Sequence, residues 1–167
     1  MTSPALFQQT VAVFGASSGI GLAVARGARA LGARVIAIGR DRARLQAALG
    51  SDDGGIEIGV CDVAQEEQVA ALLRDLGALH DVVVTAGSVV AATPLAALDF
   101  DAARAAIATK LHGSLIVAKH AAPRLASGGS IGFTTGVLGR KITANTVVKT
   151  VINAGLEAAV RQLAREL

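Results

Sequence analysis

The chain has 167 residues, a net charge of +3 and one cysteine, Cys61, so neither a disulfide framework nor a strongly basic nucleic-acid surface is expected. Apolar residues make up 52% of the chain and aromatic residues only 2%, which argues against aromatic platforms for single-stranded nucleic acid. The longest uncharged run, Val82–Leu98, contains glycine and proline and is too interrupted for a membrane span. The first residues lack the features of a signal peptide. We therefore expect a soluble, cytoplasmic protein with no nucleic-acid or membrane partner.

A glycine-rich stretch follows the first β-branched run of the chain. Val11–Phe14 has the composition of a short strand, Gly15–Gly21 has the sequence GASSGIG, and the residues after it have helical spacing. Strand, glycine turn and helix in this order are typical of the first unit of a dinucleotide-binding βαβ fold. We expect Gly15 to turn the chain, Gly19 to admit a pyrophosphate and Gly21 to let the helix pack closely. The alternative is a glycine turn with a purely structural role.

The N–H groups at the start of this helix, with the positive end of the helix dipole, are expected to bind an anion. The other residues of the turn, Ser17, Ser18 and Ile20, are therefore expected to line the same cofactor site. Neither serine has the histidine and aspartate pattern of a nucleophile. The three histidines of the chain lack the spacing of metal ligands, so no metal site is expected.

Strand and helix patterns alternate along the rest of the chain. Further strands are expected over residues 34–39, 56–61, 81–86 and 129–135. Helices are expected over residues 41–49, 65–76, 99–125 and from about residue 144 to the end, and loops over residues 50–55 and 88–98. The alternation predicts right-handed crossovers in one α/β domain covering residues 1–167. Its sheet would be a doubly wound, Rossmann-type parallel sheet with the strand order 3-2-1-4-5.

The end of the chain has an unusual pattern. The last six residues continue a helix without a cap or a glycine, and the fifth strand is apolar on both sides although nothing follows it in the sheet. We interpret the sequence as part of a longer protein.

Several motifs, taken in order, resemble those of the short-chain dehydrogenase/reductase family. They are Gly15–Gly21, Asp62-Val63 after the third strand, Thr85-Ala-Gly87 after the fourth, Gly129-Ser-Ile131 in the fifth, and Leu163–Leu167. The resemblance implies a Rossmann fold and a nicotinamide dinucleotide cofactor. It also implies that Asp62 receives the adenine amino group, that Val63 lines the adenine site, and that Ala86 and Gly87 support the adenine ribose. The alternative for Asp62 is a helix N-cap.

The end of the second strand predicts which cofactor is used. NAD-selective relatives place an acidic residue there to bind the ribose 2′-hydroxyl, whereas this chain has Gly39 followed by Arg40. A guanidinium is a bidentate partner for a 2′-phosphate, and Ser17 can add a hydroxyl. The sequence therefore predicts NADP(H). The alternative is that Arg40 is a solvated loop residue.

The residues that usually carry catalysis in this family are only partly matched. The family places Asn on the long helix, Ser after the fifth strand and Tyr-x-x-x-Lys on the next helix, but this chain contains no tyrosine. Counting from the matching motifs puts Lys149 in the tyrosine position and Asn153 in the lysine position. The serine position falls on Gly136, beside Thr135, and the asparagine position falls on Lys110.

An amine and an amide have thus exchanged positions relative to the family. Asn145, Lys149 and Asn153 recur every four residues, which places them on one face of the last helix. A desolvated lysine near a second cation has a lowered pKa, so Lys149 is a candidate proton donor. Lys110, Asn153 and Thr135 complete the set of catalytic candidates. The alternative is that Lys149 only closes the cofactor pocket or faces solvent.

Two functions fit this pattern. One is an NADPH-dependent oxidoreductase that reduces a carbonyl or an activated double bond of a small-molecule substrate. The other is a non-catalytic NADP(H)-binding sensor or pseudo-enzyme; the polar residues retained at the former catalytic positions favour the enzyme. Both the long helix and the last helix are rich in Ala, Val and Leu on more than one face, which predicts a homo-oligomer formed through them. Relatives pair in this way, as the resemblance implies.

Overall fold

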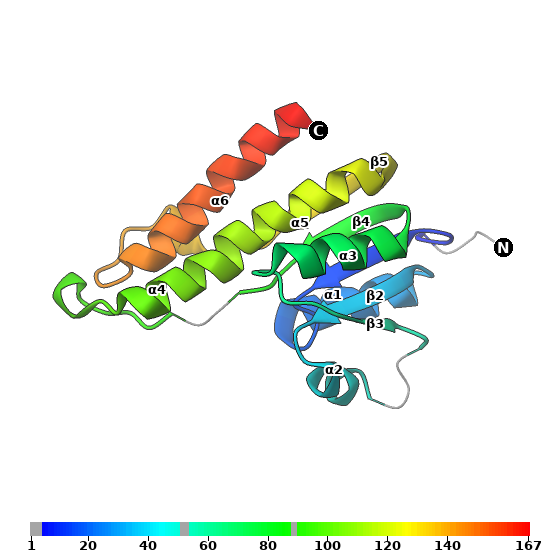
Figure 1. Cartoon of the computed structure of the whole chain (residues 1–167), viewed down its shortest axis with the longest axis horizontal. Coiled ribbons are helices and arrows are strands. Elements are labelled where there is room, and N and C mark those ends of the chain that lie inside the picture. Colours follow the sequence, from blue (N-terminus) through cyan, green and yellow to red (C-terminus); the bar gives the residue numbers. More distant parts are fainter. Residues whose placement is uncertain (1–4, 51–53, 88–89) are drawn as a thin grey trace.

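Five parallel strands form one sheet in the computed structural model, which describes residues 5–50, 54–87 and 90–167. The strand order is β3-β2-β1-β4-β5, as predicted (Figure 1). The strands are Thr10–Phe14 (β1), Arg34–Gly39 (β2), Glu57–Val60 (β3), Leu79–Val84 (β4) and Leu125–Phe133 (β5). The α-helices are Gly19–Ala30 (α1), Arg42–Leu49 (α2), Glu66–Leu76 (α3), Phe100–Ile107 (α4), Gly113–Ala121 (α5) and Val147–Glu166 (α6). Residues 51–53 and 88–89 of the two predicted loops lie outside the described residues.

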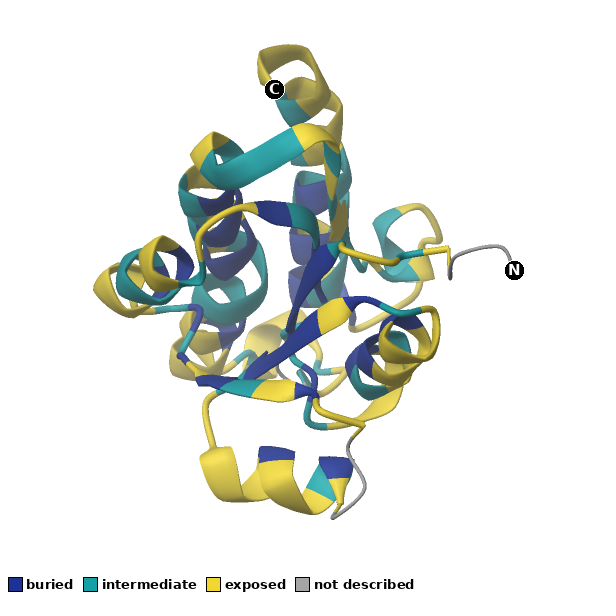
Figure 2. Ribbon diagram, turned by 90° about the vertical axis from the view of Figure 1, so that its right-hand side faces the viewer, coloured by how far each residue is buried: buried dark blue, intermediate teal, exposed yellow. Residues whose placement is uncertain are grey.

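The central strand β1 is buried on both faces and divides the core in two. Ala12 and Phe14 point to one face, where α3 and α5 pack. Val11 and Val13 point to the other face, where α1 and α2 pack. This alternation follows from the two-residue period of a strand, and it explains why β1 contains no polar side chain except at its start. Figure 2 shows the buried residues concentrated in these central strands.

The predicted long helix over residues 99–125 is interrupted and ends early. A π-helical turn, Ala108–His112, joins α4 to α5, and the three segments run as one long rod beside α6 (Figure 1). The α-helix stops at Ala121, and a 3₁₀ turn, Ala122–Arg124, leads directly into β5. Pro123 accounts for the early end, because proline has no N–H group to donate to a carbonyl of the preceding turn.

The last helix begins at Val147 rather than near residue 144. Asn145 adopts a left-handed backbone conformation with φ of 64°, which does not continue into a helix, and Thr146 takes the N-cap position. The expectation that Asn145 shares a helix face with Lys149 and Asn153 is therefore wrong. Only the latter two residues lie on α6.

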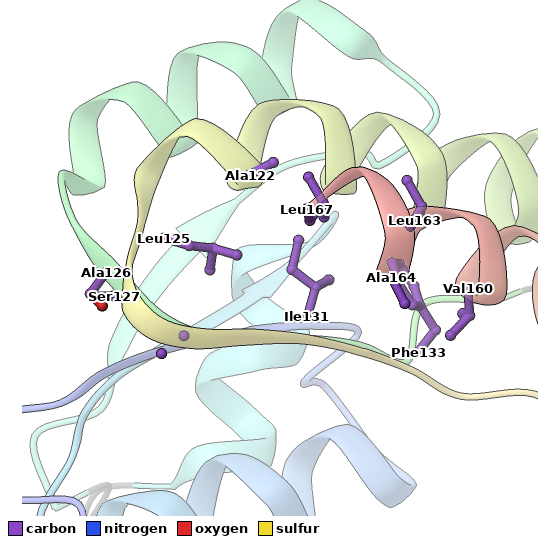
Figure 3. Close-up of a pocket in the computed structure, with 12 residues that line it drawn as sticks. Ala122, Leu125, Ala126, Ser127, Ile131, Phe133, Val160, Leu163, Ala164 and Leu167 are labelled. Carbon is purple, nitrogen blue, oxygen red and sulfur yellow. The ribbon is translucent and has the colours of Figure 1, made fainter.

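β5 pairs only with β4 among the described residues, so it is the edge strand that the sequence predicts. A groove of about 430 Å³ lies between β5 and the second half of α6 (Figure 3). Its walls include apolar side chains from both elements, Ile131 and Phe133 on the strand and Val160 and Leu163 on the helix. No helix within the described part of the chain is long and apolar enough to cross a membrane.

Two of the three glycines of α1, Gly21 and Gly27, provide a matched test of how this helix packs. A Cβ on Gly21 would overlap the Gly15 carbonyl oxygen and lie 2.5 Å from Thr85 Oγ1, whereas nothing lies within 4 Å of the Cβ position of Gly27. Gly21→Ala should therefore lower the free energy of unfolding by about 1–3 kcal/mol, the cost of overpacking. Gly27→Ala should raise it by about 0.5–1 kcal/mol, because alanine favours a helix. Urea denaturation measures both; equal changes for the two variants would contradict the close packing.

Candidate functional site

A cavity of about 560 Å³ opens at the carboxyl ends of β1, β2 and β4, where the strand order reverses. Most of the residues predicted to bind the cofactor line it: Gly15, Ser17, Ser18, Gly19, Ile20, Gly21, Arg40, Val63, Ala86 and Gly87. The sequence analysis did not assign several other lining residues to the site: Phe14, Ile38, Gly39, Arg44, Cys61, Thr85, Thr109 and Thr134. The cavity thus collects the ends of three strands and the start of α1.

The glycines of the turn have the separate roles that their spacing predicts. Gly15 turns the chain with φ of 88°, and a Cβ there would lie 2.6 Å from the Ala86 backbone nitrogen. Gly21 admits no side chain, because its Cβ would overlap the Gly15 carbonyl oxygen. Gly19 has φ of 53°, and nothing lies within 4 Å of its Cβ position. At that point the backbone faces open space in which a ligand can approach closely.

Thr85 locks this turn to the neighbouring strand. Its Oγ1 lies 2.9 Å from the Phe14 carbonyl oxygen and 3.2 Å from that of Gly15, so the hydroxyl donates to the end of β1. The backbone N–H of Thr85 also donates to the Phe14 carbonyl, at 2.8 Å. The sequence signal was its place directly before Ala86 in the Thr85-Ala-Gly87 motif, but its side-chain partner in β1, Phe14, lies 71 residues earlier in the chain.

The start of α1 has the features of an anion site. Ser18 is the N-cap, but its side chain makes no capping hydrogen bond, and the first turn contains no acidic residue. The first N–H groups of any α-helix lack intrahelical acceptors, and the helix dipole adds positive potential there. The open space in front of Gly19, together with this helix start, fits a dinucleotide pyrophosphate.

The side of the cavity next to β2 is basic. Arg40 follows β2, and Arg44 lies in the first turn of α2; both line the cavity. No carboxylate is among the described residues that line it. Sequence analysis assigned only Arg40, although the position of Arg44 near the start of the predicted helix was a usable signal.

The structure contradicts the alternative role of Asp62 as a helix N-cap. The N-cap of α3 is Gln65, so Asp62 is not the helix cap; its Oδ1 accepts a hydrogen bond from the Ala64 N–H at 3.0 Å. Its neighbours Cys61 and Val63 line the cavity, but Asp62 is not among the lining residues. Burial, assisted by the Asp62 carboxylate, raises the pKa of the Cys61 thiol to about 11, so the thiol stays neutral.

A buried amide joins the catalytic candidates. Asn153 is only 6% exposed, and its Oδ1 accepts from Lys110 Nζ at 3.1 Å and from the Gly136 N–H at 2.9 Å. Its Nδ2 donates to the Lys149 carbonyl oxygen at 2.8 Å. The structure therefore brings Lys110, Asn153 and the serine position, Gly136, together. Thr135 lies apart from this group, since its exposed side chain bonds Glu157 at 3.3 Å.

The two lysines differ in their surroundings. Lys110 lies in the π-helical turn, where its carbonyl accepts the Ser114 hydroxyl at 2.6 Å. Burial lowers the pKa of its amine below the usual lysine value, and its Cδ lies 3.5 Å from the Cβ position of Gly87 on the cavity wall. Lys149 is half-buried on α6. Neither lysine is among the residues that line the cavity. The described residues also contain no group of three or more His, Cys, Asp or Glu side chains able to hold a metal.

Comparisons with known proteins agree with this geometry. A family model described as enoyl-(acyl carrier protein) reductase matches residues 15–167. A short-chain dehydrogenase/reductase of Acremonium sp is 30% identical over 99% of this chain and 70% of its own length. Carbonyl reductase family member 4 of Danio rerio is 31% identical over 93% of this chain and 68% of its own length.

Solved structures give the same result. The crystal structure of a small-chain dehydrogenase in complex with NADPH superposes with a TM-score of 0.79 and 31% identity. The match covers 95% of this chain and 65% of that protein, so the present chain spans slightly less than two thirds of its length. With a family model covering most of the chain and two relatives at this level of identity, the chain belongs to the short-chain dehydrogenase/reductase family.

Proposed function

We propose that the protein is an NADPH-dependent oxidoreductase that reduces a carbonyl or an activated double bond of a small-molecule substrate. The observation that carries the proposal is the cavity at the strand ends, which combines a glycine turn, an open helix start and two arginines, with no carboxylate among its described lining residues. Such a site suits a dinucleotide with an additional phosphate. The relatives support the reaction class, since one is named a carbonyl reductase and another was crystallised with NADPH.

The residues of this chain would divide the binding of NADP(H) among them. Gly15, Ser17, Ser18, Gly19, Ile20 and Gly21 would hold the pyrophosphate, Arg40 the 2′-phosphate, and Val63, Ala86 and Gly87 the adenosine. Asp62 would receive the adenine amino group, since its carboxylate has acceptor sites beyond the one that the Ala64 N–H uses. When bound, the cofactor supplies the hydride. The protein must supply the proton that completes a carbonyl reduction.

Lys110 is the better supported source of this proton. Its ammonium group is held by Asn153, and burial makes it a stronger acid than an ordinary lysine. It also lies beside Gly87, at the wall of the cofactor cavity. Asn153 and Gly136 act as positioning groups in this proposal, because the amide fixes the ammonium and the loop after β5 at the same time. Lys149, in the family's tyrosine position, remains the competing donor.

A non-catalytic NADP(H)-binding protein is the second candidate. It is favoured by the absence of tyrosine from the sequence and by Gly136, which offers no hydroxyl in the family's serine position. Stopped-flow oxidation of bound NADPH against a panel of ketones, quinones and enones separates the two. Turnover with any of these substrates supports the oxidoreductase; micromolar NADPH binding without turnover of any of them supports the sensor.

The choice of cofactor should depend on Arg40. Arg40→Ala removes a guanidinium that lines the cavity beside β2, so NADPH binding should weaken by about 1.5–3 kcal/mol, the worth of a hydrogen bond to a charged group. NADH binding should change little. Fluorescence titration with both cofactors measures the effect. Equal losses for NADPH and NADH would mean that Arg40 supports the loop instead of binding the phosphate.

The pH dependence of turnover should identify the proton donor. A general acid must be protonated, so kcat should stay level at neutral pH and fall as pH rises through the lowered pKa of Lys110. Lys110→Met should lower kcat by about 10²–10⁴-fold and abolish this alkaline limb, with NADPH affinity measured in parallel. Lys149→Met is the matched control and should keep the limb. The reverse pattern would assign the proton to Lys149.

The homo-oligomer remains a prediction, and exposed side chains on two helices suggest where to test it. Exposed apolar side chains lie on the neighbouring helices α5 and α6. Leu115 on α5 is 38% exposed, and Val147 and Val151 on α6 are 46% and 52% exposed. Burying them against a second copy would remove this surface from water. We expect Val151→Asp to shift the mass measured by multi-angle light scattering toward the monomer. A monomeric wild-type protein would contradict the prediction.

A further inference from the structure

Arg44 lies at the same corner of the cavity as Arg40 but reaches it from a different element. Arg40 follows the end of β2, whereas Arg44 is the third residue of α2. Side chains on a helix tilt toward its N-terminus, which here means toward the turn after Gly39. Both arginines accordingly line the cavity, together with Ser17 of the glycine turn.

Both guanidinium groups are available to a ligand. Within the described ranges, neither Arg40 nor Arg44 has a side-chain hydrogen bond or an ion pair. Two other arginines of this half of the chain are engaged: Arg34 pairs with Glu57 at 2.7 Å, and Arg26 donates to the Ala48 carbonyl oxygen at 2.8 Å. Two unengaged guanidinium groups on one cavity wall concentrate positive charge where no structural partner uses it.

One carboxylate is close to this corner and already has a role. Asp41 is the N-cap of α2, and its Oδ1 accepts a hydrogen bond from the Arg44 backbone N–H at 3.1 Å. Asp41 does not line the cavity in the described structure. Its contact is with the backbone of Arg44 and leaves the guanidinium of that residue unbound. Replacing the Arg44 side chain therefore keeps the helix cap.

Building on the proposed NADPH site, we propose that Arg44 is a second specificity-determining residue, which holds the 2′-phosphate jointly with Arg40. A phosphate monoester carries a charge of about −1.5 to −2 at neutral pH, so one guanidinium does not neutralise it. Two guanidinium groups do, and each offers a bidentate fork to the phosphate oxygens. Arg40 and Arg44 then discriminate together between NADPH and NADH. The positive end of the α2 dipole also favours the phosphate.

The test compares Arg44→Ala with Arg42→Ala by isothermal calorimetry. Arg42 is an exposed arginine of the same helix that does not line the cavity, so its variant controls for net charge. The ligands are NADPH, NADH and adenosine 2′,5′-bisphosphate. For Arg44→Ala we expect NADPH and the bisphosphate to bind about 10–100-fold more weakly, as for a lost hydrogen bond to a charged group, with NADH within twofold of wild type. Arg42→Ala should match wild type for all three.

Two results of the comparison between Arg44→Ala and Arg42→Ala would overturn the role of Arg44. The first is equal weakening by Arg44→Ala and Arg42→Ala, which would indicate general electrostatics; the second is equal weakening of NADPH and NADH by Arg44→Ala. Thermal unfolding of each variant checks that the Asp41 cap has kept α2 folded. A wild-type protein that binds neither NADPH nor the bisphosphate would instead reject the proposed function itself. Selective loss in Arg40→Ala alone would leave the proposed function intact and reject only the present inference.

Discussion

The close approach of three backbone segments at the start of α1 is the constraint on which the rest of the site depends. The helix begins against the carbonyl of Gly15 because Gly21 has no side chain, and Thr85 bonds the same carbonyl from the end of β4. A single added methyl group at Gly21 would separate these segments. The contact holds the first turn of the helix directly over the ends of β1 and β4, where the cavity opens. Without this contact, the free N–H groups at the start of α1 would not lie beside the cavity.

A second feature is the relocation of an amine from one helix to another. In the positions where the family has lysine and asparagine, this chain has Asn153 and Lys110, and the two side chains are hydrogen-bonded across α6 and the π-helical turn. Both polar atoms of the Asn153 amide are hydrogen-bonded. The oxygen accepts from Lys110 and Gly136, and the nitrogen donates to the Lys149 carbonyl. Removing one partner of such a buried group leaves the others unsatisfied, so the two replacements support each other.

The fold could be predicted closely from the sequence, because alternation of apolar strands and amphipathic helices determines a parallel sheet with few possible orders. Local errors arose where one residue overrides the pattern. Pro123 ends the long helix early, and the left-handed backbone of Asn145 delays the last one. Most of the cofactor site followed from motifs of adjacent residues. The motifs did not identify Arg44, because Arg44 lines the cavity through the direction in which a helical side chain tilts.

The choice between the two candidate proton donors was harder to make from the sequence for a related reason. Spacing alone placed Lys149 at the site, but spacing does not show which amine is buried or what it contacts. The lowered pKa of Lys110 depends on its burial, which brings together residues 43 positions apart in the chain. Position relative to the family therefore suggested the candidate residues, while burial and hydrogen bonding distinguish the surroundings of the two lysines.

The central claim is that this cavity binds a dinucleotide bearing a 2′-phosphate. The most direct measurement is calorimetric titration of the wild-type protein with NADPH and with NADH under identical ionic strength. The two basic side chains and the absence of a lining carboxylate predict that NADPH binds at least about tenfold more tightly, equivalent to about 1.4 kcal/mol. Equal affinities, or tighter binding of NADH, would contradict it.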